Sequence, residues 1–234
     1  GGMMLLFDQR TGREKGVLVD ECFLTNVRTA VAGAICAEAL APDPMECIGV
    51  LGTGVQARMQ VSYLSSITRC RQVKVWGRSE QKMRKYQDDM SKDGWQVDTC
   101  SAPGDVAASC NFIITATPAK APLLRVDDVK RGTHITAMGS DSPGKQELEP
   151  GVLGKADLIV ADSILQCRER GEIIHALTSG LIDEKDIIEL GTILDEKALG
   201  RTTDDQITIA DLTGVAVQDI QIAKAVFEAL HKGT

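Results

Sequence analysis

One segment organises the 234-residue chain, and it reads Cys47-Ile48-Gly49-Val50-Leu51-Gly52-Thr53-Gly54-Val55-Gln56-Ala57. The apolar run Ile48–Leu51 predicts a buried strand, and Gly52-x-Gly54-x-x-Ala57 follows it directly, before a segment typical of a helix. Gly52 permits the tight turn, Gly54 lets a pyrophosphate approach the backbone, and Ala57 keeps helix and strand close. Phosphates would lie on free N–H groups at the helix N-terminus, where the dipole favours negative charge. The pattern indicates a dinucleotide site; the alternative is a glycine-rich turn that only packs.

Composition is that of an ordinary globular protein and excludes several classes of partner. Hydrophobic residues make up 43% of the chain and charged residues 25%, and the net charge is -7. Because the chain has no block of basic residues and no long apolar run, we expect a cytoplasmic protein that binds neither nucleic acid nor membrane. The seven cysteines are scattered without a C-x-x-C pair, which favours reduced, buried thiols and predicts no metal site.

From Met45 onward, strand and helix patterns alternate along the chain. Such alternation predicts an α/β fold, with a doubly wound parallel sheet of the Rossmann type and helices on both faces. The predicted strands are 47–51, 72–76, 95–100, 111–116, 133–138, 157–161 and 206–210. The predicted helices are 55–67, 80–92 and 164–178, with shorter ones near Val106 and Pro150.

The two ends of the chain follow a different pattern. Apolar runs at 3–7 and 16–19, separated by a turn-rich segment, predict a β-hairpin. One helix is expected from Leu24 to about Leu40 with Thr25 as its N-cap, and a last helix is expected to follow Thr213. The apolar face of that last helix predicts that it packs on the segment before residue 45.

The end of the second predicted strand bears on the choice of cofactor. Sites that prefer NAD commonly place a carboxylate there, which binds the ribose 2′-hydroxyl. Here the strand is followed by Gly77-Arg78-Ser79, so a guanidinium and a hydroxyl can contact a 2′-phosphate and no carboxylate repels it. The pattern favours NADP(H), and NAD(H) is the alternative if Arg78 is simply solvated.

Further candidate residues lie at the ends of strands and helices. Thr117 follows the fourth predicted strand, where it either contacts a nicotinamide ribose or is a polar strand end. Asp141 lies on the loop that follows Met138 and Gly139, and partial burial there would suit it to acid/base work near neutral pH. Turn chemistry explains Asp141 equally well. Arg28, in the first turn of the predicted helix, either binds an anionic ligand, or extends into solvent or pairs with a local carboxylate.

Four segments, in order along the chain, resemble motifs of one family. They are Leu24-Thr25-x-x-Arg28-Thr29-Ala30, Gly52-Thr53-Gly54-Val55-Gln56-Ala57, Gly139-Ser140-Asp141-Ser142-Pro143-Gly144-Lys145-Gln146-Glu147-Leu148 and Thr213-Gly214-Val215-Ala216-Val217-Gln218-Asp219. Together they are similar to the ornithine cyclodeaminase/μ-crystallin family over essentially the whole chain. The resemblance implies a nicotinamide-binding Rossmann domain and a second domain that binds substrate and forms dimers.

The resemblance also implies roles for individual residues. Asp141 matches the acid/base aspartate of the cyclodeaminases, and Arg28 matches the arginine that faces the cofactor and the substrate carboxylate. With the residues derived above, the expected cofactor-binding positions are Gly52, Gly54, Val55, Gln56, Ala57, Gly77, Arg78, Ser79, Thr117, Met138, Gly139, Lys145, Leu212 and Val215.

The same resemblance divides the chain into three parts. Residues 1–44 would form a partial substrate and dimerisation domain, residues 45–212 the NAD(P)-binding Rossmann domain, and residues 213–234 a helix that returns to the substrate domain. We expect a homodimer. The family has a substrate-binding arginine and lysine upstream of the position where this chain starts, so half of the substrate pocket is expected to be missing from it.

These expectations point to hydride transfer at the α-carbon of a small amino or imino acid. The first hypothesis is an ornithine cyclodeaminase, which forms proline and ammonia, and the alternative is a ketimine reductase or amino-acid dehydrogenase that uses NADPH. A truncated protein that binds the nicotinamide cofactor without turnover is a further alternative, because the upstream arginine and lysine are missing.

Overall fold

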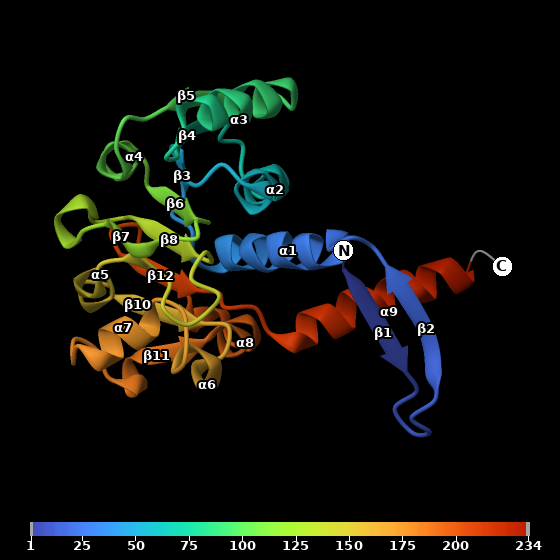
Figure 1. Ribbon diagram of the computed structural model, residues 1–234. Coiled ribbons are helices and arrows are strands. Elements are labelled where there is room, and N and C mark those ends of the chain that lie inside the picture. The colour runs from blue at the N-terminus through green and yellow to red at the C-terminus, as the bar shows by residue number, and fades with distance from the viewer. Residues whose placement is uncertain (1, 233–234) are drawn as a thin grey trace.

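The computed structural model describes residues 2–232, and an eight-stranded parallel sheet forms its centre (Figure 1). The strand order is β11-β10-β12-β8-β6-β3-β4-β5. The strands are β3 (Ile48–Leu51), β4 (Gln72–Trp76), β5 (Gln96–Thr99), β6 (Phe112–Thr115), β8 (His134–Ala137), β10 (Leu158–Ala161), β11 (Ile187–Glu189) and β12 (Thr208–Asp211). From β5 to β12 this is the order of a doubly wound dinucleotide-binding sheet, so the predicted fold class is confirmed.

The register of the sheet brings the carboxyl ends of its central strands to one edge. Leu51, the last residue of β3, lies opposite Trp76 of β4 and Thr115 of β6. Thr115 in turn lies opposite Ala137 of β8, and Ala137 opposite Asp211 of β12. All residues of β3, β6, β8, β10 and β12 are buried, as expected for parallel strands covered on both faces. Loops that leave these strands therefore meet along one edge.

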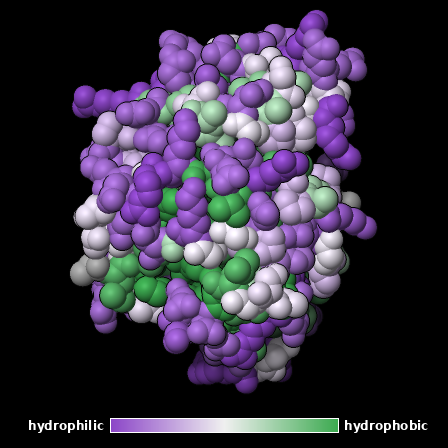
Figure 2. Space-filling view, turned by 90° about the vertical axis from the view of Figure 1, so that its left-hand side faces the viewer, coloured by the Kyte–Doolittle hydropathy of each residue, from purple (hydrophilic) through white to green (hydrophobic). Residues whose placement is uncertain are grey.

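Helices cover both faces of the sheet through separate apolar clusters. Cys36 and Leu40 of α1 pack against β10 and β12, and Val61 of α2 and Tyr86 of α3 pack against β3 and β4. Helices α4, α5 and α7 cover the other face. Figure 2 shows the outside of this face as hydrophilic toward its top and edges, with hydrophobic residues gathered across its middle and lower part. The helices are α1 (Phe23–Leu40), α2 (Val55–Leu64), α3 (Glu80–Lys92), α4 (Pro103–Ser109), α5 (Pro150–Gly154), α6 (Ile164–Cys167), α7 (Ile173–Thr178), α8 (Leu190–Asp195) and α9 (Ala216–Lys232).

The predicted hairpin is confirmed and stands away from the sheet (Figure 1). It consists of β1 (Met3–Phe7) and β2 (Glu14–Val19), and α9 packs against both β1 and α1. One face of the hairpin is apolar and exposed, and its residues are Met3, Leu5, Phe7, Val17 and Val19. A second small sheet pairs β7 (Lys120–Leu124) with β9 (Gln146–Leu148). Short 3-10 turns occupy Val126–Asp128, Glu184–Asp186 and Lys197–Leu199.

Several local predictions are wrong. The segment 164–178 forms two short helices, because Gly171 has φ +91° and breaks the run between α6 and α7. Helix α1 begins at Phe23, and the Leu24 N–H donates to Asp20 Oδ2 at 2.6 Å, so Thr25 is not its N-cap. Strands β7, β9 and β11 were absent from the prediction, because each is short and lacks a strong apolar pattern of its own. Among the described residues, no helix has the length and apolar character needed to cross a membrane.

Candidate functional site

A cleft of about 1000 Å³ opens at the carboxyl ends of β3, β4 and β6. Ligands of open parallel sheets bind in this place, where the strand order reverses. Seven of the sequence-predicted site residues line the cleft: Gly52, Gly54, Val55, Gly77, Arg78, Ser79 and Thr117. The structure therefore brings together three segments that are far apart in the sequence.

The glycine loop has the geometry that the sequence predicts. Gly52 has φ +124°, and a Cβ there would lie 2.5 Å from the carbonyl oxygen of Ala116, so only glycine fits. Gly54 is the N-cap of α2, and no atom lies within 4 Å of the place where its Cβ would be. The backbone at Gly54 is thus open to the cleft, with the N-terminus of a ten-residue helix behind it. A phosphate group would have room beside Gly54 and would face the N–H groups at the positive end of the helix dipole.

Basic side chains surround the glycine loop on one side of the cleft. We call this set the cationic side; it consists of Arg58, Arg78, Lys82 and Lys85, and a fifth cation, Lys120, lines the cleft from the start of β7. Among the described residues that line the cleft, Asp89 is the one carboxylate, and Arg58 Nη2 and Lys85 Nζ lie 3.2 and 3.1 Å from its Oδ2. Five cations against one carboxylate make the cleft attractive to a polyanion.

Sequence reasoning found Arg78 but missed the other four cations. Arg58 lies one turn along α2, where its guanidinium donates to the carbonyl oxygen of Gly54 at 3.2 Å and lies 5.0 Å from the ring centre of Tyr86. Lys82 and Lys85 are three residues apart on α3, which follows Ser79 directly. Their helical spacing after the Gly77-Arg78-Ser79 segment was the available signal, since residues three apart share a helix face.

Gly77 has a steric reason for lacking a side chain. A Cβ at this position would lie 2.8 Å from Cγ2 of Thr53, in the glycine loop. A side chain at the end of β4 would therefore require Thr53 to shift. The hydroxyl of Ser79 caps α3 by accepting from the Lys82 N–H at 3.4 Å.

Other predicted residues lie behind the cleft rather than on it. The Gln56 side chain donates to Asn26 of α1, to its carbonyl oxygen at 3.2 Å and its Oδ1 at 3.1 Å. Ala57 is a buried residue of α2. Met138 and Leu212 belong to the apolar cluster beneath α1. The cofactor roles expected of these residues remain predictions.

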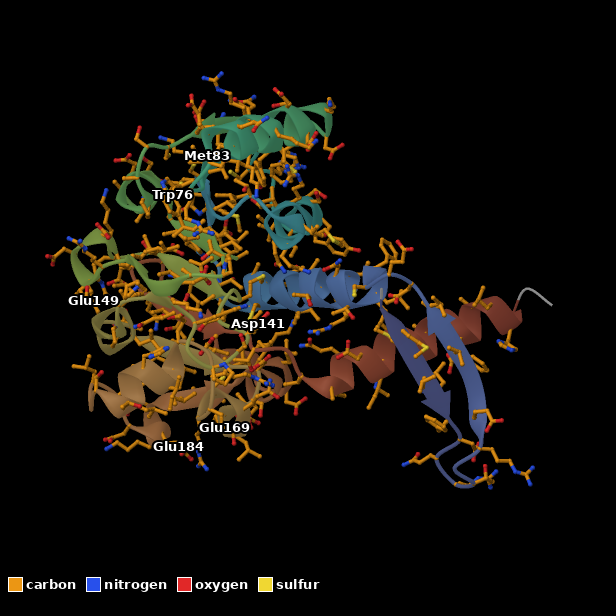
Figure 3. The ribbon with its side chains drawn as sticks, in the orientation of Figure 1. Trp76, Met83, Asp141, Glu149, Glu169 and Glu184 are labelled. Carbon is orange, nitrogen blue, oxygen red and sulfur yellow. The ribbon has the colours of Figure 1, made fainter. Side chains whose placement is uncertain are left out.

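Asp141 and Lys145 form an ion pair on the loop after β8, with 2.6 Å between Oδ1 and Nζ. The Asp141 side chain is 57% exposed, so it lacks the partial burial that would suit it to acid/base work near neutral pH. The loop turns at Gly144, which has φ +80°. Figure 3 shows Asp141 below the level of α1, whereas Trp76 of the cleft lies above it.

Arg28 lies in the second turn of α1 and not in the first turn as predicted. Its Nε contacts Asp219 Oδ1 at 3.1 Å, and its Nη1 donates to Gln218 Oε1 at 2.9 Å. Both partners belong to α9, whose first turn begins beside Val215; the carbonyl oxygen of Val215 accepts from the Gln218 N–H at 3.0 Å. Arg28 therefore pairs with a carboxylate, as one of the interpretations of the sequence has it, but this carboxylate comes from the far end of the chain and is not local.

Three buried acids connect the end of β12 to the segments that follow β6, β8 and β10. We call Glu147, Glu172 and Asp211 the carboxylate chain. Asp211 Oδ2 accepts from the backbone N–H groups of Glu172 and Ile173, at 2.7 and 2.9 Å. Glu172 accepts from the N–H groups of Glu147 and Leu148, at 2.8 and 2.9 Å. The sequence prediction missed all three, because nothing in their spacing marks them as buried.

Burial raises the pKa of each member of this chain. Desolvation is the largest cause for Glu147, and hydrogen bonds from Thr115 and Thr117 oppose it. The pKa of Glu172 is raised well above its ordinary value by burial and by the charge of Asp211. Burial raises the pKa of Asp211 to about 7. These acids are held by backbone donors that partly offset the cost of burying a charge.

The buried histidine His134 has ordinary structural surroundings. His134 Nδ1 and Nε2 are hydrogen-bonded to Thr208 and Thr136, at 2.8 and 2.9 Å, and burial lowers the pKa of His134 to about 3. Within residues 2–232, no cluster of three or more His, Cys, Asp or Glu side chains is arranged to hold a metal ion. The chemistry available at the site is therefore that of the cations, the Asp141–Lys145 pair and Arg28.

Comparison with known proteins gives a consistent result. The ornithine cyclodeaminase/mu-crystallin family model matches residues 2–234. An uncharacterized cyclodeaminase of Sinorhizobium fredii is 38% identical over 97% of this chain and 69% of its own length. An archaeal alanine dehydrogenase dimer with bound NAD has a TM-score of 0.91 and 35% identity, covering 99% of this chain and 72% of that one. The iminosuccinate reductase of Paracoccus denitrificans, in complex with NAD+, has a TM-score of 0.91 and 35% identity, covering 99% of this chain and 71% of that one.

Proposed function

The chain belongs to the ornithine cyclodeaminase/mu-crystallin family, and on this premise we propose that it reduces a small imino acid, or oxidises the corresponding amino acid, with a nicotinamide cofactor. One observation carries the proposal: the glycine loop and the cationic side face one cleft at the point where the strand order reverses. The relatives with solved structures are named for amino-acid oxidation and imino-acid reduction, and both hold NAD.

The residues of the chain divide the work as follows. A bound dinucleotide supplies the hydride acceptor or donor. Arg28 binds the substrate carboxylate. Its contacts with Gln218 and Asp219 use two of the five N–H groups of the guanidinium, which leaves the other three to donate to a ligand. Asp141 gives a proton to the imine nitrogen or takes one from the amine, while hydride adds to or leaves the α-carbon. Lys145 holds the Asp141 carboxylate in place at 2.6 Å.

For the cofactor, the geometry favours NADP(H) over NAD(H). With glycine at position 77, no carboxylate is present there to bind the ribose 2′-hydroxyl or to repel a 2′-phosphate. Arg78 and Lys82 line the cleft beside Gly77. A 2′-phosphate would gain charge-assisted hydrogen bonds there. NAD(H) is the alternative, because the two solved relatives bind NAD.

A cyclodeaminase is the second candidate, and one observation favours it. The segment Asp141-x-Pro143-Gly144-Lys145 matches the cyclodeaminase motif, and the S. fredii relative carries that name. In this reaction the side-chain amine of ornithine attacks the imine formed at the α-carbon, ammonia leaves, and the hydride returns to give proline. The cofactor is then unchanged at the end of each cycle.

A pair of assays separates these reactions. Pyruvate with ammonia, oxaloacetate with ammonia, and a cyclic ketimine acid are each incubated with the protein and NADPH or NADH, and the loss of reduced cofactor is followed. In parallel, ornithine with a catalytic amount of oxidised cofactor is analysed for proline and ammonia. Stoichiometric loss of reduced cofactor supports the reductase, and proline without net cofactor change supports the cyclodeaminase. Activity in neither assay would refute both.

We also propose that the protein forms a homodimer through the hairpin. The exposed apolar face formed by Met3, Leu5, Phe7, Val17 and Val19 is the kind of surface that protein partners cover. A second copy is the partner with the best support, because the archaeal relative is a dimer. Leu5→Glu should convert the dimer to a monomer in sedimentation; an unchanged mass would refute this interface.

A further inference from the structure

Glu147 joins the ends of two neighbouring strands, although it does not line the cleft. Its side chain is completely buried. Oε2 accepts from the Thr115 hydroxyl at 2.7 Å and from the Gly139 N–H at 2.9 Å, and Oε1 accepts from the Thr117 N–H at 2.7 Å. Three donors from the ends of β6 and β8 thus meet on one carboxylate.

The packing around Gly139 shows how closely this arrangement is built. A Cβ on residue 139 would lie 2.3 Å from the carbonyl oxygen of Thr117 and 2.4 Å from Oε2 of Glu147. Only a glycine lets the two strand ends approach the carboxylate together. The close approach and the three hydrogen bonds define one geometry for the backbone at Thr117 and Gly139.

Glu147 is itself held from behind by the rest of the carboxylate chain. Its backbone N–H donates to Glu172 at 2.8 Å, and the Glu172 N–H donates to Asp211 at 2.7 Å. Asp211 is the last residue of β12, the next strand after β8 in the sheet. These hydrogen bonds connect Glu147 to three central strands, β6, β8 and β12. The position of Glu147 therefore does not depend on its own short strand, β9, alone.

The two residues that Glu147 holds lie on the half of the cleft away from the cationic side. Thr117 lines the cleft, and Gly139 begins the loop that carries Asp141. The glycine loop and Arg78 follow β3 and β4, on the opposite side of the point where the strand order reverses. A dinucleotide crosses this point with one mononucleotide on each half, so the half beside Thr117 and Gly139 takes the nicotinamide.

We infer that Glu147 is a positioning residue: it fixes the backbone of Thr117 and Gly139, against which the nicotinamide half of the dinucleotide binds, and leaves the phosphate-binding half unaffected. The inference rests on the dinucleotide site proposed above. In Glu147→Gln, the amide offers one acceptor oxygen and one NH₂ group in place of two acceptor oxygens. Either the Thr117 N–H or the Gly139 N–H then faces a donor, and that strand end must move.

The test compares a whole cofactor with a fragment that lacks nicotinamide. Dissociation constants of NADPH and NADH, and of ADP-ribose with and without the 2′-phosphate, are measured by calorimetry for the wild type and for Glu147→Gln. We expect the variant to bind the dinucleotides about tenfold more weakly, as for one buried hydrogen bond lost, and to bind the ADP-ribose fragments within about twofold of the wild type. If Glu147 only stabilised the fold, the variant would lose affinity for the dinucleotides and for the ADP-ribose fragments to the same extent.

Asp157→Asn is the matched control. Asp157 precedes β10, at the amino end of the same sheet, where Oδ2 accepts from the Ile207 N–H at 2.7 Å and pairs with Arg131 at 2.7 Å. This variant makes the same chemical change far from the cleft and should leave all four affinities unchanged. If Glu147→Gln does not fold, Thr115→Val removes one of the three donors and should weaken the dinucleotides alone, by about threefold.

The outcomes separate the inference from the proposed function. If the wild type binds neither dinucleotide nor ADP-ribose, the proposed cofactor site is wrong. If the wild type binds them and a folded variant loses affinity equally for both kinds of ligand, or for neither, the positioning role of Glu147 is wrong.

Discussion

The cationic side and the carboxylate chain lie along the same edge of one sheet but are built in opposite ways. The cationic side consists of long side chains that line the cleft, such as Arg78 and Lys82, and these can contact a ligand directly. The carboxylate chain consists of buried acids, which accept mainly from backbone N–H groups and do not themselves line the cleft. One half of the edge therefore offers charge, and the other half offers a fixed backbone.

The difference teaches how the two halves divide the needs of one ligand. Phosphates are recognised by charge, which acts over several ångströms and tolerates small movements of long side chains. Hydride transfer needs the reacting atoms held closely in one geometry. Buried carboxylates with several backbone donors supply such rigidity at the ends of β6 and β8. Four predictions, beginning with the largest expected effect, test this division.

Asp141 follows β8, on the same side of the sheet edge as the carboxylate chain, but unlike those acids it is exposed and can act on the substrate directly. Asp141→Asn cannot transfer a proton, so we expect the rate with the best imino or amino acid to fall about 10²–10⁴-fold while cofactor affinity is retained. Initial rates at saturating cofactor are the measurement. Asp205→Asn is the control, since Asp205 is also exposed and pairs with Arg131 at 3.1 Å. Equal rates for Asp141→Asn and wild type would remove the proton-transfer role.

Two glycines of the same loop should respond differently. Gly52→Ala forces a Cβ to 2.5 Å from the Ala116 carbonyl at φ +124°, which should lower the free energy of unfolding by about 2–4 kcal/mol. Gly54→Ala meets no atom within 4 Å, so stability should stay the same while dinucleotide affinity falls about tenfold. Urea unfolding and calorimetric binding check both. If Gly54→Ala leaves dinucleotide affinity intact, the phosphate does not approach at Gly54.

The cationic side should discriminate between the two cofactors. Arg78→Ala removes a charge-assisted contact with the 2′-phosphate, so NADPH should bind about 10- to 100-fold more weakly while NADH changes little. Arg84→Ala is the control, because Arg84 lies on α3 but pairs with Glu80 at 2.6 Å in solvent. The ratio of the two dissociation constants is the measurement. An equal loss for both cofactors would exclude the 2′-phosphate role of Arg78.

The carboxylate chain should appear as a pH dependence of stability. The pKa of Asp211 is raised from 3.8 to about 7, so the folded protein binds an extra proton between these values, and the stabilisation is lost as pH rises through about 7. Asp211→Asn keeps an acceptor oxygen for the two N–H groups that now share Oδ2 but cannot ionise. Between about pH 5 and about pH 8, the wild type should lose about 2–3 kcal/mol more of its free energy of unfolding than the variant.

Urea unfolding at the two pH values measures this difference. The exposed Asp93→Asn is the matched control and should follow the wild type. A wild type whose stability is flat over this range, or an Asp211→Asn variant that follows it, would show that Asp211 does not titrate as its burial implies.

Much of the sheet and half of the site could be predicted from the sequence. The predicted strands 72–76 and 157–161 and the predicted helix 80–92 agree with β4, β10 and α3 to within one residue. The glycine loop, Gly77 and Arg78 come together in one cleft as expected. These features succeed because a strand, a helix start and a turn each depend on residues that are neighbours in the chain.

Prediction failed where a residue depends on distant partners. Whether Asp141 is partly buried depends on the course of the whole loop, which no local pattern reveals, and its side chain is exposed. Arg28 finds its carboxylate in Asp219, 191 residues away. The helix predicted at 164–178 breaks at Gly171, where a Cβ would lie 2.3 Å from Asp211 Oδ2, and no local pattern reveals that contact.

The amino-acid sequence by itself determined the alternation of strands and helices, the turn at Gly52 and the absence of a carboxylate at residue 77. Local sterics and periodicity are sufficient causes for each. Only the tertiary structure decided that Glu147 would bind the ends of β6 and β8, because its three donors lie 8 to 32 positions away in the chain. A buried carboxylate and an exposed one are the same letter in a sequence; what separates them is which backbone N–H groups the fold brings within hydrogen-bonding distance.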